Sequence, residues 1–156
     1  MKHTVPARIA AASVAAIALA GCSYVNPITT QENYAASDGT QLIVGDVEAL
    51  NLIVITEALD SPATLIGTLH NGSAEDAVVT VTFDAMTTTD VEVPAGESVK
   101  LGPEEGDVEV SGTSTVQPGL VVETVFQDQG AGTYITDVPV LDGTLPEYTH
   151  LIDEIG

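Results

Sequence analysis

The chain has 156 residues, with three Lys or Arg against 23 Asp or Glu, and therefore a formal net charge of −20. An acidic surface of this kind repels phosphate backbones, which excludes nucleic-acid binding. The single cysteine cannot form an internal disulfide, so packing alone must stabilise the fold.

The first 21 residues have the composition of a secretory signal. Lys2 and Arg8 precede residues 9–20, "IAAASVAAIALA", which carry no charge. A basic start, a short apolar run and a small-residue site are the three parts of such a signal. The apolar run is shorter than the about 20 residues that a membrane-spanning helix needs. We therefore expect residues 1–21 to be removed as a signal peptide.

The proposed cleavage motif consists of Leu19, Ala20, Gly21 and Cys22. It resembles the bacterial lipobox, in which the cysteine thiol is joined to diacylglycerol and the chain is cleaved just before it. The alternative is an ordinary signal peptide with an incidental cysteine. Two acyl chains anchor a protein stably, whereas one is marginal. We expect a protein anchored through Cys22 to the extracytoplasmic face of the cell membrane.

Cleavage before Cys22 would leave 135 of the 156 residues, a size that suits one domain. All 23 acidic residues would remain, with Lys100 as the only Lys or Arg, so the formal charge becomes −22. Anionic lipids would repel this surface, so the membrane contact must come from the lipid on Cys22. The charge indicates solubility or adaptation to salt or divalent cations more than a specific ligand.

Residues 22–40 are polar and contain several turn formers, which predicts a lipidated N-terminus and a flexible tether. From residue 41, short apolar alternations are separated by Gly, Pro, Asn and Asp. They predict strands at 41–47, 49–57, 63–70, 77–83, two within 90–102, 107–111, 120–127 and 133–141. The first two could be one bent strand.

About seven to nine strands without helices or repeats predict an all-β domain over residues 41–141, an immunoglobulin-like antiparallel β-sandwich. Alternation directs Val79, Val81 and Phe83 into its core. Pro139 lacks a backbone donor, which predicts that the last strand is an edge strand near its end. We interpret residues 142–156 as an acidic C-terminal tail, for which the sequence predicts neither a strand nor a helix.

Two stretches, "VEVPAGESVKL" (91–101) and "TDVPV" (136–140), carry a resemblance to a known family. They resemble the "I-P-A-G-x-x-V-x-L" and "V-x-V-P-V" patterns of the periplasmic copper chaperone family PCu(A)C. The resemblance covers about 60 residues, from Val79 to Leu141. It implies a cupredoxin-like sandwich and similarity to small actinobacterial membrane lipoproteins that share this domain.

The copper ligands of that family do not carry over. Copper(I) needs soft donors, which the family supplies from His and Met, including a His-x-Met pair after the Pro-Ala-Gly stretch. Here that region reads "GDVEVS", with Val108 and Val110 in place of soft ligands. Only Met86 falls near a family ligand, and His70 is the other weak candidate. We expect the fold without the copper site and no cofactor, while diverged metal handling stays open as an alternative.

Two further groups of residues have both a functional and a simpler interpretation. His70 and His150 could form a metal pair, but their spacing favours two solvated histidines. An acidic run could bind calcium, although it lacks the pattern of a known calcium loop and a solvated charge run is favoured. This run consists of Glu104, Glu105, Asp107 and Glu109.

The sequence contains no Gly-x-Ser-x-Gly elbow, His-Glu-x-x-His pair, P-loop or dinucleotide-binding glycine pattern. We therefore interpret the protein as non-enzymatic. It would act as a binding or accessory module for an unidentified envelope protein or ligand. A structural spacer without any ligand is a further alternative, which an exposed apolar patch of a few hundred Å² would argue against.

Overall fold

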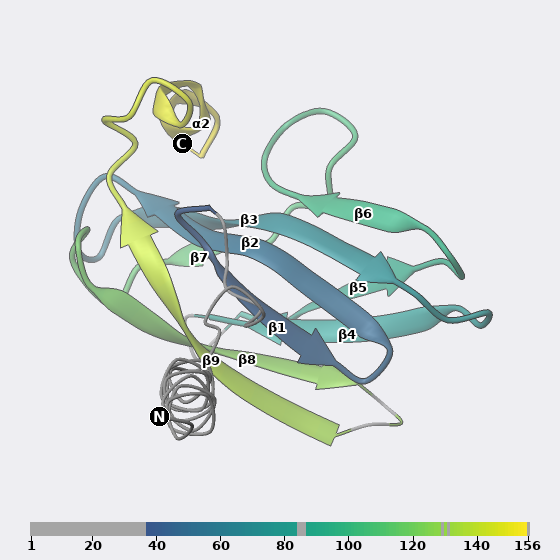
Figure 1. Cartoon of the computed structure of the whole chain (residues 1–156). Coiled ribbons are helices and arrows are strands. Elements are labelled where there is room, and N and C mark those ends of the chain that lie inside the picture. Colours follow the sequence, from purple (N-terminus) through teal and green to yellow (C-terminus); the bar gives the residue numbers. More distant parts are fainter. Residues whose placement is uncertain (1–36, 84–86, 129, 131, 156) are drawn as a thin grey trace, which may run out of the picture. The chain divides into compact units, whose positions relative to one another are not determined.

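The computed structural model describes residues 37–83, 87–128, 130 and 132–155. These residues form an all-β fold of nine strands with one short helix (Figure 1). The elements are β1 (Thr40–Val44), β2 (Val47–Thr56), β3 (Pro62–Asn71), β4 (Ala77–Thr82), β5 (Thr89–Val93), β6 (Ser98–Leu101), β7 (Ser111–Thr113), β8 (Val121–Asp128), β9 (Gly132–Leu141) and α2 (Thr149–Glu154). Within the described part of the chain, no helix is long and apolar enough to cross a membrane.

The strands form two sheets that β9 joins. Sheet A contains β1, β2, β3, β6 and β7, and sheet B contains β5, β4, β8 and β9. The strand order is β5-β4-β8-β9-β2-β3-β6, and all pairs within it are antiparallel except β2 with β9. The predicted all-β sandwich is therefore confirmed, with the two sheets continuous along one side.

Pro139 does not mark an edge strand, so that expectation is wrong. The last residues of β9, Val140 and Leu141, pair in parallel with Val54 and Ile55 of β2. Val140 exchanges backbone hydrogen bonds with the segment before β8, and backbone groups alternate in direction along a strand. A backbone N–H at position 139 would therefore point away from β8. The pairing of β9 with β2 begins only at the next residue, Val140.

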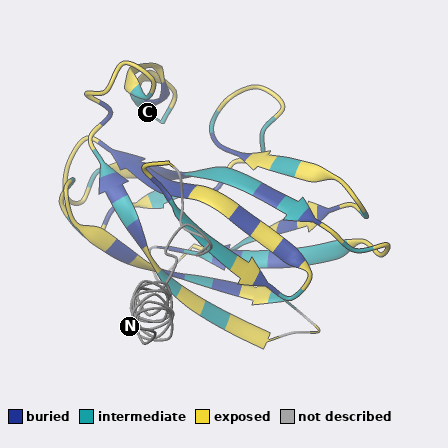
Figure 2. Ribbon diagram, in the orientation of Figure 1, coloured by how far each residue is buried: buried dark blue, intermediate teal, exposed yellow. Residues whose placement is uncertain are grey.

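The main core lies between the two sheets and is built from alternate strand residues (Figure 2). Val79, Val81 and Phe83 are buried in it, as the sequence predicts. Phe126 of β8 is its largest fully buried side chain. Each buried Val, Leu or Phe side chain contributes roughly 1.5–3 kcal/mol by leaving water, which compensates for the absence of a disulfide.

An extra residue in β2 changes which side chains face this core. Val47 and Ala49 face it, and so do Leu52 and Val54, so the alternation shifts by one residue between them. The register with β3 shifts at the same point, where Asn51 has a φ of 52°. A bulged residue has this effect on the residues that follow it.

As a result of this shift, Ile53 and Ile55 of β2 face the outside of sheet A. They are fully buried there because Leu151 of α2 packs on them, forming a second, smaller core. The sequence analysis predicts strands only, whereas residues 149–154 form this helix. Six residues give too little helical periodicity to be recognised, and tertiary packing on the sheet stabilises the helix.

The first two predicted strands are present as separate strands, β1 and β2, joined by a turn at Gly45 and Asp46, so they are not one bent strand. One strand prediction differs from the structure in detail. The predicted strand at 107–111 is reduced to a parallel bridge between Val108 and Leu101, and β7 follows it at Ser111–Thr113.

Candidate functional site

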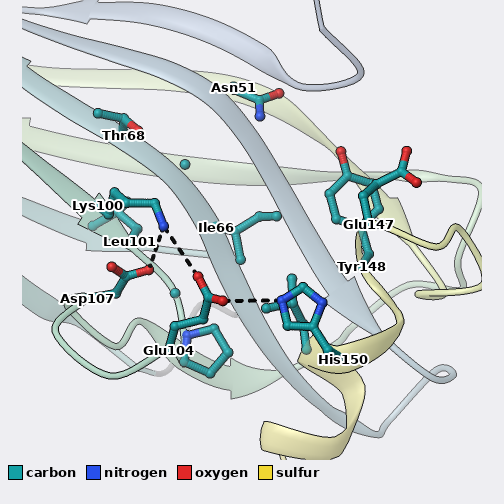
Figure 3. A pocket seen from close by; sticks show the side chains of 14 residues that line it. Asn51, Ile66, Thr68, Lys100, Leu101, Glu104, Asp107, Glu147, Tyr148 and His150 are labelled. Carbon is teal, nitrogen blue, oxygen red and sulfur yellow. Dashed lines mark hydrogen bonds and ion pairs between the residues drawn. The ribbon is translucent and has the colours of Figure 1, made fainter.

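A pocket of about 200 Å³ lies on the outer face of sheet A, beside α2 (Figure 3). Strands β2, β3 and β6 supply one side, the segment after β6 a second, and the C-terminal segment a third. Ile66, Leu101 and Leu151 contribute apolar surface. The polar side chains that line it are Asn51, Thr68, Lys100, Glu104, Asp107, Glu147, Tyr148 and His150.

A chain of charge contacts crosses the pocket. Lys100 Nζ lies 3.3 Å from Glu104 Oε2 and 3.4 Å from Asp107 Oδ2. His150 Nε2 lies 3.3 Å from the other carboxylate oxygen of Glu104, Oε1. Glu104 therefore connects a strand of sheet A with the C-terminal helix, as Figure 3 shows.

The backbone after β6 explains why these side chains meet. Leu101 is buried in the main core, so its neighbour Lys100 points to the outer face. The chain then loops back, with the Asp107 N–H donating to the Glu104 carbonyl at 3.0 Å. The Val108 N–H donates to the Lys100 carbonyl at 2.9 Å, which places Asp107 beside Lys100.

The contacts shift the pKa values of the paired groups. Hydrogen bonding to Lys100, then its positive charge, hold the pKa of Glu104 below its ordinary value, and His150 adds to this. Glu104, together with Asp107, raises the pKa of Lys100. Glu147 is a third carboxylate in the lining, so the pocket carries a formal charge of −2 while His150 is neutral.

Tyr148 forms part of the wall that the C-terminal segment supplies. Its ring is half-buried, and this burial is the main reason why its pKa is raised. The negative charges of Asp38 and Glu147 raise it further. A hydrogen bond between the phenol and the Asp38 side chain raises the pKa as well, so the Tyr148 hydroxyl already has a partner.

His70 and His150 lie at different places on the outer face of sheet A. His70 is half-buried, lies on the face opposite the buried Leu69, and its Nδ1 is 3.0 Å from Ser98 Oγ on β6. His150 lies on α2 and pairs with Glu104. Among the described residues, no group of three or more His, Cys, Asp or Glu could hold a metal ion.

The four residues of the acidic run after β6 do not share one partner. Glu104 and Asp107 bind Lys100, and Glu109 accepts a hydrogen bond from Ser111 Oγ. Glu105 is exposed to solvent. Only two of these four carboxylates, Glu104 and Asp107, lie at one point, and Lys100 occupies it.

Sequence reasoning missed the pocket because it considers Lys100 only in the charge count of the cleaved chain. The available signal is that the only lysine of the domain is followed by Gly102 and Pro103 and then by acids. The contribution of His150, 46 residues away from Glu104, depends on where the C-terminal segment packs. The other predicted site residues, Leu19, Ala20, Gly21, Cys22 and Met86, lie outside the described residues.

Solved structures with a similar fold exist. The apo PCuAC domain from PmoF1 superposes with a TM-score of 0.51 at 17% identity, over 64% of this chain and 97% of that domain. The described chain has the PCuAC fold. The copper-bound PCuAC domain from PmoF2 gives a TM-score of 0.49 at 18% identity, over 65% of this chain and 97% of that domain. No family model and no curated protein matches the sequence.

The comparison confirms the fold that the sequence resemblance implies. The metal site is a separate question, because one fold hosts unrelated functions. In the described part of this PCuAC-like chain, the pocket around Lys100 brings together charged side chains from β6, the segment after it and α2. Its ion pairs, apolar floor and tyrosine suit non-covalent binding of a small polar group.

Proposed function

We propose that this protein is a lipid-anchored, non-enzymatic binding protein on the extracytoplasmic face of the cell membrane. The observation that carries the proposal is the PCuAC fold of the described chain. The sequence independently resembles the same family, whose members are periplasmic copper chaperones. The basic and apolar N-terminal segment and the lipobox-like motif ending in Cys22 support the location and the anchor.

The anchor has a direct test. Cells expressing the full chain are fed an alkyne-labelled fatty acid, and the protein is then purified and assayed for the label. Labelling should be abolished by Cys22→Ser, whereas Ser23→Ala, a neighbouring control, should retain it. Labelling that persists without the Cys22 thiol would contradict the anchor.

Metal handling is the form of this function that the fold comparison favours. Its candidate ligands are Met86 and His70, whose thioether and imidazole are donors suited to copper(I). The purified protein should then compete with a chromophoric copper(I) chelator, and Met86→Ala or His70→Ala should each weaken this competition. His150→Ala is the matched control, because His150 already pairs with Glu104. A chain that competes no better than a protein without such ligands would contradict metal handling.

The second candidate function is that of an accessory module for another envelope protein. The pocket beside α2 favours it, because its lining combines apolar surface, three carboxylates and a half-buried tyrosine. This arrangement needs no metal and supports contact with a protein side chain. This candidate is tested by measuring whether the pocket binds a side chain of a partner protein.

A further inference from the structure

The pocket beside α2 has an excess of negative charge that its own lysine does not neutralise. Lys100 is shared between Glu104 and Asp107, and both contacts are longer than 3.2 Å. Glu147, on the opposite wall, is exposed and forms no ion pair with the described residues. A cationic group entering between the walls would therefore meet uncompensated carboxylate charge.

The size of the pocket limits what can enter. Its volume is about 200 Å³, below the roughly 300–1,000 Å³ of pockets that enclose a drug-sized molecule. The space suits the end of one long side chain. Ile66 and Leu151 offer apolar surface to a methylene stem, and Glu104, Asp107 and Glu147 line the same pocket and offer acceptors to a charged end group.

The lining also discriminates between cations. Tyr148 presents a half-buried ring in the same wall as Glu147, as Figure 3 shows. A guanidinium group stacks on aromatic rings and binds carboxylates through two parallel hydrogen bonds, which an ammonium group cannot do. The arrangement therefore favours arginine over lysine.

We propose that this pocket receives an arginine side chain of a basic partner protein. The inference rests on the proposed function as an accessory module, and it names the partner by its charge. The 23 acidic residues against three Lys or Arg of the whole chain support it, because complementary charge steers association and excludes acidic partners. Lys100 acts as an internal competitor that occupies two of the three carboxylates.

The test uses acetyl-arginine-N-methylamide as the probe and the full chain carrying Cys22→Ser, titrated at low ionic strength and followed by amide NMR shifts. The shifts should concentrate on Thr68, Lys100, Tyr148 and His150. Lys100→Met should tighten binding by about two- to five-fold, because it frees two carboxylates from an exposed ion pair. Glu147→Gln should weaken binding by a similar factor.

Glu92→Gln on β5 is the matched control, because it removes the same charge from an exposed site on sheet B. It should leave the arginine affinity unchanged. Acetyl-glutamate-N-methylamide should not bind, and acetyl-lysine-N-methylamide should bind more weakly. Lys100 and Glu147 are exposed, so both variants should keep the amide spectrum of the fold; should one of them unfold, Glu104→Gln replaces it and should also weaken binding.

Three outcomes would overturn the proposal. In the first, Lys100→Met abolishes binding or the glutamate probe binds through Lys100, which would make the pocket an anion site. In the second, Glu147→Gln and Glu92→Gln have equal effects, which would mean that only the overall charge matters. In the third, the shifts spread over the whole acidic surface. None of these readouts depends on the lipid or on copper, so this failure is distinguishable from failure of the proposed function.

Discussion

His150 Nε2 lies 3.3 Å from Glu104 Oε1, although the two residues are 46 positions apart in the chain. The contact joins α2 to the segment that follows β6. Because Glu104 also binds Lys100, one carboxylate connects the sheet, the loop and the C-terminal segment that enclose the pocket.

This arrangement predicts a pH dependence for Glu104. Its pKa is below the ordinary value of 4.5, first because of Lys100 and then because of His150. A pKa that is lower in the folded state stabilises the fold above the unfolded value, and this stabilisation is lost as pH falls through the folded value. Carboxyl NMR titration should show the Glu104 pKa moving up towards 4.5 in Lys100→Met. An unchanged titration would contradict the pairing.

Leu151→Ala tests the second core. Leu151 covers Ile53 and Ile55 and is 5% exposed, so its truncation should cost about 2 kcal/mol of unfolding free energy and expose apolar surface. Leu145→Ala is the control, because Leu145 is 42% exposed in the same segment. Urea unfolding and binding of a hydrophobic dye report the two effects. Equal midpoints for the two variants would show that α2 does not pack on the sheet.

Gly143→Ala should release the C-terminal segment. Gly143 has a φ of 69°, and a Cβ there would clash with Ile152 Cγ1. The control is Gly96→Ala, where φ is 70° but nothing lies within 4 Å. Both carry the same cost of left-handed backbone, about 1–2 kcal/mol, and only Gly143→Ala adds a steric clash. Hydrogen exchange of the Leu151 amide, which donates to Tyr148, should therefore accelerate only in Gly143→Ala. Equal protection in both variants would contradict this packing.

Asn71→Ala should destabilise the connection between the sheets. The buried Asn71 amide donates to the carbonyls of Glu75 and Val93 and accepts two hydrogen bonds from Ser73. Truncation removes both amide donors and the acceptor of Ser73 from a buried position, which should cost about 2–3 kcal/mol. Ser73→Ala removes only the half-exposed partner and should cost less than about 1 kcal/mol. Thermal unfolding measures both changes. Equal losses of unfolding free energy in the two variants would show that the hydrogen bond from Asn71 to the Val93 carbonyl does not stabilise the fold.

Side-chain alternation made most of the fold predictable. Val79, Val81 and Phe83 alternate with threonines, so the inward face of β4 follows from periodicity alone. The orientation of β2 did not follow, because it depends on the left-handed backbone of one residue, Asn51, which a run of apolar residues conceals. The expectation for Pro139 failed because β9 belongs to both sheets, a long-range pairing that no local pattern reports.

The candidate site was predictable only in parts. Glu104 and Asp107 were recognised as an acidic run, but they were not connected with Lys100, because the loop that returns Asp107 to it is a tertiary feature. His150 and Tyr148 could not be connected with them, since the helix that carries His150 owes its position to Leu151. Ion pairs between distant segments need the fold before they can be seen.

The central claim is that this PCuAC-like domain is held at the membrane through Cys22. The intact mass of the protein purified from the membranes of its own cells tests it most directly. The account predicts one species that begins at Cys22 and carries the added mass of a diacylglyceryl group on its thiol. A species that retains residues 1–21, or one that begins elsewhere with an unmodified cysteine, would contradict it.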